Sequence, residues 1–160
     1  LQRNVKNLFL VKYRIGAARL EAGEYEAARA QFEAFLDYRG RPTALAANSD
    51  YLVVSLLKAY AYRYANDRTA DRLEDLAGFS AFALRTGGLV APDVAPFWSA
   101  LQSFFAAHAA SDVEGRQQAL ADAERAPPHG PKGVASWTPL FSEMMKNEMR
   151  RLHLEATAGL

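Results

Sequence analysis

The sequence predicts an all-α protein built from stacked helical hairpins, with one further helix covering the end of the stack. Apolar residues recur three and four positions apart along the whole chain, and no strand-like alternation is visible. Helix-stopping and helix-capping residues interrupt this pattern at short intervals. Because one hairpin cannot bury its own apolar face, the hairpins must stack, and the last face of an open stack needs a cover.

The first predicted hairpin spans residues 4–40. Its first helix starts near Asn4, which can cap it, and Gly23 closes it. Its second helix runs from Tyr25 to Tyr38, after which Gly40 and a proline prevent the helix from continuing.

The second predicted hairpin spans residues 49–87. The cap-forming run 48–50, Asn-Ser-Asp, precedes its first helix, and Thr69 or Asp71 opens its second. The two glycines at 87–88 stop that helix.

The third predicted hairpin spans residues 93–127, with Asp93 and Asp112 as the caps of its two helices. A loop over residues 129–137 separates it from a last helix over 138–157, which begins with a capping threonine and a proline at the first helical position. Since the chain starts with leucine rather than methionine, we expect it to be a piece of a longer protein.

The first hairpin carries small and aromatic residues at a spacing typical of closely crossing helices. Gly16 follows an isoleucine on the first helix, and Ala28 and Phe32 lie four apart on the second. Small residues allow two helices to approach closely, and aromatic residues fill the space beside them. We therefore expect Gly16 and Ala28 to lie at the crossing of the two helices.

A second match lies in the third hairpin, where Trp98, Leu101 and Phe105 stand on the first helix and Gly115 and Ala119 on the second. Both hairpins resemble the tetratricopeptide repeat, and the resemblance covers about residues 9–128 as three repeats, of which the middle one matches least. The chain departs from the family at Lys12 and Arg19, where aromatic residues are preferred, and at Gln102, where glycine is expected. The resemblance implies a right-handed α-solenoid over residues 1–128. The alternative is an ordinary helical bundle with one hairpin that mimics the motif.

The sequence contains no recognisable catalytic, cofactor or metal site. It has no cysteine, and its three histidines lack a second histidine or carboxylate at ligand spacing. We interpret His108 as a partly buried helix residue, and His129 and His153 as ordinary surface groups. We therefore expect no enzyme, no cofactor and no bound metal.

Charge and hydropathy limit the classes of partner. The formal net charge is +1, so no strong field attracts nucleic acid, and the segment 58–64 places only Lys58 and Tyr62 together on its outer side. The longest nearly apolar run, residues 51–57, is far shorter than the roughly 20 residues that span a bilayer. Membrane insertion and nucleic acid binding are therefore not expected.

The family resemblance implies a concave groove that binds a peptide or a partner protein. Carried over position by position, its predicted contact residues are Tyr13, Ala17, Leu20, Tyr51, Val54, Lys58, Tyr62, Ser99 and Ser103. Some family members bind the C-terminal carboxylate of a chaperone through lysine and asparagine. Tyr13 and Ala17 stand at those positions here, so no chaperone-tail clamp is expected.

The predicted function is thus a non-catalytic scaffold or adaptor domain for protein–protein interaction. The first alternative is a structural subunit or helical arm of a larger assembly. The second is an RNA-binding helical repeat, which would require a basic stripe that the sequence lacks. The methionines of the last helix, Met144, Met145 and Met149, are expected to cover apolar surface rather than to bind a partner.

Overall fold

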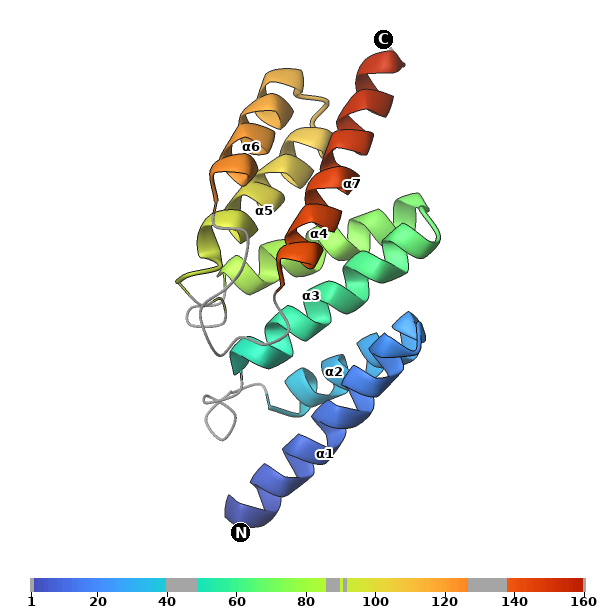
Figure 1. Cartoon of the computed structure of the whole chain (residues 1–160), viewed down its shortest axis with the longest axis vertical. Helices are drawn as coiled ribbons and strands as arrows, with labels where there is room; N and C mark the ends of the chain where they lie inside the picture. The colour runs from blue at the N-terminus through green and yellow to red at the C-terminus, as the bar shows by residue number, and fades with distance from the viewer. Residues whose placement is uncertain (1, 40–48, 86–89, 91, 127–137, 160) are drawn as a thin grey trace. The chain divides into compact units, whose positions relative to one another are not determined.

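A computed structural model describes residues 2–39, 49–85, 90, 92–126 and 138–159, and side chains within 11–33, 53–85, 90, 92–126 and 138–159. Its described residues form helices and contain no strand, which confirms the all-α prediction (Figure 1). In chain order the helices are α1 (Gln2–Glu21), α2 (Tyr25–Arg39), α3 (Ser49–Asn66), α4 (Ala70–Arg85), α5 (Ala95–Ala109), α6 (Val113–Arg125) and α7 (Pro139–Ala158).

The chain divides into two compact units, Leu1–Leu76 and Ala77–Leu160, with the boundary inside α4. In the first unit α1 packs on α2, and α3 packs mainly on α2 and to a smaller extent on α1. In the second unit α5 packs on α6, and α7 packs mainly on α6 and to a smaller extent on α5. Each unit therefore contains a helical hairpin followed by a helix that lies chiefly against its second member.

Several predicted helix ends are confirmed. Gly23 ends α1 with φ of +79°, a left-handed conformation that glycine adopts without strain. The side chain of Asp112 accepts a hydrogen bond from Gly115 N and caps α6, while Thr138 accepts from Phe141 N and caps α7.

Two predicted caps are wrong. Asn4 lies inside α1, which already begins at Gln2. Asp93 does not cap α5, because the preceding residues form a turn that makes Val94 the N-cap, without a side-chain hydrogen bond. Val94 is 2% exposed, so burial of its side chain accounts for the position of this turn. The predicted stops at residues 40, 42 and 87–88 and the loop 129–137 lie outside the described residues.

The ring of Phe32 fills the space beside Gly16 in the first hairpin. A Cβ atom on Gly16 would lie 2.6 Å from Cε1 of Phe32, well inside van der Waals contact. Ala28 and Phe32 are 0% and 1% exposed, so α2 presents a small and a large residue to the core. The close approach predicted for Gly16 therefore exists, and its partner is the Phe32 ring.

One side of α3 forms the core of the first unit. Leu56, Leu57, Tyr60 and Tyr64 are between 0% and 8% exposed, so they form the buried side of the helix. Their spacing of three and four residues places them on one stripe.

The second unit buries large side chains of α5 against small ones of α6. Trp98 and Leu101 are fully buried, and Ala119 and Ala123 on α6 are equally inaccessible. The indole Nε1 of Trp98 donates to the carbonyl oxygen of Ser80, 3.0 Å away, so its polar atom is satisfied. On α7, the side chains of Phe141, Met145 and Met149 are at most 1% exposed, so these two methionines are core residues, whereas Met144 is partly exposed.

Two glycine substitutions should change stability in opposite directions. In Gly16→Ala, the added Cβ meets a ring that is itself buried and cannot move freely, so the free energy of unfolding should fall by about 1–3 kcal/mol. In Gly78→Ala, on α4, the added Cβ meets nothing within 4 Å, and the better helix propensity should raise stability by about 0.5–1 kcal/mol. Urea unfolding of both variants measures the difference. Equal midpoints for the two variants would contradict the observed Gly16 packing.

Candidate partner-binding face

Five of the predicted contact residues lie on neighbouring helices of the first unit. Tyr13, Ala17 and Leu20 follow one another along α1 at intervals of four and three residues, which places them on one stripe. Lys58 and Tyr62 stand four apart on α3. All five are partly exposed. We call this set the α1–α3 face.

A contact between the two helices brings the stripes together. The hydroxyl of Tyr13 lies 3.2 Å from Oγ of Ser55, at hydrogen-bonding distance. Ser55 is three residues before Lys58 and seven before Tyr62, so it belongs to the same side of α3. The side of α1 that carries Tyr13 and the side of α3 that carries Lys58 and Tyr62 therefore adjoin.

Partial burial changes the protonation equilibria on α3. Burial lowers the pKa of Lys58, and the nearby carboxylate of Glu21 on α1 opposes this effect. Burial, reinforced by Tyr25, raises the pKa of Tyr62. The rings of Tyr25 and Tyr62 stack with centroids 5.7 Å apart. A partly desolvated ammonium beside aromatic surface interacts more strongly with a carboxylate than a fully hydrated one does.

The remaining predicted contact residues have other positions. Val54 is 2% exposed, so its assignment to a contact surface is corrected: it is a core residue, because residues 53–57 of α3 are buried on every side of the helix. The side chain of Tyr51 lies outside the described residues. Ser99 and Ser103 are exposed on α5, in the second unit.

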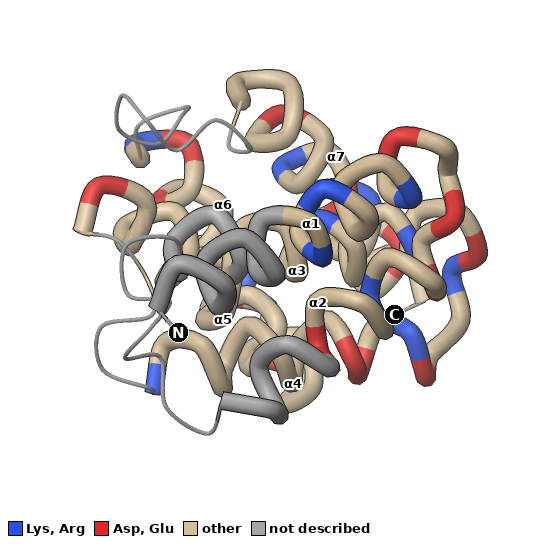
Figure 2. The backbone as a smooth tube through the Cα atoms, turned by 90° about the horizontal axis from the view of Figure 1, so that it is seen from below, with Lys and Arg blue, Asp and Glu red and all other residues tan. Residues whose placement is uncertain are grey.

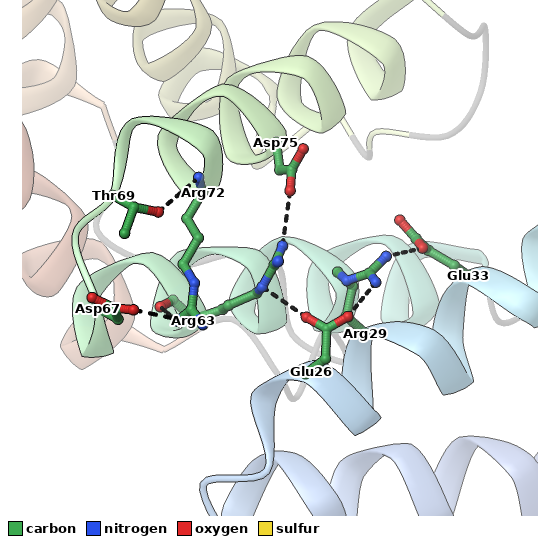
Figure 3. A network of polar contacts seen from close by, with 8 residues as sticks. All are labelled: Glu26, Arg29, Glu33, Arg63, Asp67, Thr69, Arg72 and Asp75. Atoms are coloured by element: carbon green, nitrogen blue, oxygen red, sulfur yellow. Dashed lines mark hydrogen bonds and ion pairs between the residues drawn. The ribbon is translucent and has the colours of Figure 1, made fainter.

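An ion-pair network that the sequence analysis missed joins α2, α3 and the start of α4 (Figure 3). Arg63 is at its centre: its Nε lies 2.7 Å from Oε2 of Glu26, and its Nη1 donates to Oδ2 of Asp75 at 2.9 Å. Arg29 donates hydrogen bonds to both Glu26 and Glu33. Residues 26, 29 and 33 stand three and four apart on one helix, so the sequence alone could have predicted this part of the network.

The network continues into the turn between α3 and α4. Nη1 of Arg72 donates to the carbonyl oxygen of Arg63 at 2.9 Å, while its Nη2 lies 3.8 Å from Asp67. Glu26 and Arg63 directly follow Tyr25 and Tyr62 in the chain. The network therefore fixes α2 against α3 at the same level as the stacked tyrosines, and so orients the α1–α3 face.

Two kinds of site are absent from the described residues. Within them, no cluster of three or more histidine and carboxylate side chains could hold a metal ion, and no helix is long and apolar enough to cross a membrane. Figure 2 shows basic and acidic positions interspersed along the same helices.

Comparison of the chain with protein-family models, with curated proteins and with solved structures finds no match.

Replacement of Arg63 should loosen the attachment of α3. Arg63→Met removes a side chain that is 18% exposed and that serves two carboxylates. Because both carboxylates are half exposed and can be rehydrated, we expect a loss of only about 1–2 kcal/mol. Arg125→Met, which breaks an exposed pair on α6, should cost less than about 0.5 kcal/mol. Thermal unfolding of the two variants tests this, and equal losses would show that the network does not hold the helices together.

Acid should weaken the same network through Glu26. The hydrogen bond from Arg29 lowers the pKa of Glu26 below its usual 4.5. Partial desolvation raises this pKa, whereas the charges of Arg63 and Arg72 lower it further. This carboxylate therefore stabilises the fold above pH 4.5, and its contribution is lost as the pH falls through the lowered pKa. Glu26→Gln should show a smaller loss of stability than the wild type between about pH 5 and pH 3. Parallel stability–pH curves would contradict this assignment.

Proposed function

We propose that the chain is a non-catalytic protein–protein interaction domain, a tetratricopeptide-like α-solenoid of three hairpins closed by a capping helix. It binds a peptide or a protein segment on the α1–α3 face. The observation that carries this proposal is the partly exposed pair of stripes, one apolar and aromatic and one carrying a lysine, on adjoining helices. Tyrosine combines a large apolar area with a polar tip, and such residues often dominate binding energy.

The repeated geometry of the two units supports the solenoid. In both, a helical hairpin is followed by a helix packed chiefly on the second hairpin helix. Both hairpins also turn in the same way: Glu24 N donates to Arg19 O at 2.8 Å, and Asp112 N donates to Ala107 O at 2.8 Å. These bonds close the same six-residue turn, with Gly23 at φ +79° and Ser111 at φ 55° in the left-handed position.

A structural role is the second candidate. Val11 and Ile15 stand four apart on α1 and are 55% and 41% exposed. An exposed apolar pair of this kind favours a permanent neighbour on that side of α1. The two candidates differ in which surface of α1 is buried by the partner.

Peptides selected from a random library on the immobilised protein provide the test. The double variant Ala17→Glu, Lys58→Ala should bind the selected peptides at least about tenfold more weakly, because it blocks the centre of the face and removes its cation. Both positions are partly exposed, so the fold should tolerate the changes. The matched control is Ala121→Glu on an exposed site of α6. Equal binding to the double variant and the control, or selection of no peptide, would refute this function.

A further inference from the structure

Arg116 on α6 is a buried cation without a buried anion. The residue is 2% exposed, and its Nε donates to Nδ1 of His153 on α7 at 3.1 Å. Among the side chains that the structure describes, no carboxylate lies within ion-pair distance of its guanidinium. A neutral imidazole accepts one hydrogen bond but leaves the charge uncompensated, and burial of an uncompensated charge is costly.

A buried polar atom without a hydrogen-bond partner lies on α5. Nδ1 of His108 on α5 is sealed from solvent and has no hydrogen-bond partner. Its ring stacks on Phe104, with centroids 6.3 Å apart. Burial, together with the charge of Arg116, lowers the pKa of His108, and Glu155 acts in the opposite direction. Glu155 itself is engaged by Arg151, 2.7 Å away on the same helix.

We propose that the junction of α5, α6 and α7, at Arg116, His108 and His153, binds an oxyanion of a ligand, either a carboxylate or a tetrahedral phosphate-type group. The planar guanidinium is suited to two parallel hydrogen bonds with such a group, and its charge then becomes compensated. The unsatisfied Nδ1 of His108 adds a further polar group from α5. The site lies in the second unit, so the proposal is independent of the function assigned to the α1–α3 face.

Inorganic sulfate is the first probe, because it stays doubly charged over the relevant pH range. Sulfate is titrated against chloride at constant ionic strength, and the imidazole proton signals of His108 and His153 are followed by NMR. We expect a saturable shift of both signals. A parallel titration with acetate distinguishes a carboxylate site, saturated by acetate, from a tetrahedral one, saturated by sulfate alone.

Arg116→Met should weaken sulfate binding at least about tenfold, whereas Arg125→Met, on the exposed side of the same helix, should leave it unchanged. The proposal is overturned if neither ion shifts the wild-type imidazole signals beyond the chloride control. Equal binding by the two arginine variants also overturns it. If Arg116→Met does not fold, the wild-type titration alone tests the proposal, through the presence or absence of a saturable shift.

Discussion

The first unit depends on the position of one aromatic ring. Phe32 occupies the space that Gly16 leaves open, and the ring of Tyr13 lies against it with centroids 5.8 Å apart. The hydroxyl of Tyr13 then reaches Ser55 on α3. Phe32 and Tyr13 therefore link side chains of three helices, and a larger residue at position 16 would displace the Phe32 ring.

The candidate face follows from how α3 is held. Leucines and tyrosines of α3 form its buried side. Arg63 of the same helix forms ion pairs with Glu26 on α2 and with Asp75 on α4. With α3 fixed in this way, Lys58 and Tyr62 stay partly exposed beside the stripe of α1. The candidate face is therefore defined by residues of both helices together.

Local sequence signals predicted several helix ends correctly. The features that were not predicted depend on contacts between residues far apart in the sequence. Gly23, Asp112 and Thr138 act through neighbours within a few residues, so their roles were readable from the sequence. The burial of Val54 and the pairing of Arg63 depend on which helices surround α3. His153 was read as a surface group, yet it accepts a hydrogen bond from a residue 37 positions away. Spacing along one helix carries no information about such contacts.

The central claim is that a partner covers the α1–α3 face, and thiol protection tests it most directly. The sequence has no cysteine, so Ala17→Cys and Ala121→Cys each introduce a single reactive thiol. With a saturating library-selected peptide, labelling at position 17 should slow at least about tenfold, as expected for a thiol covered by a bound partner, and labelling at 121 should be unchanged. Unchanged labelling at position 17, with the peptide bound, would contradict the account.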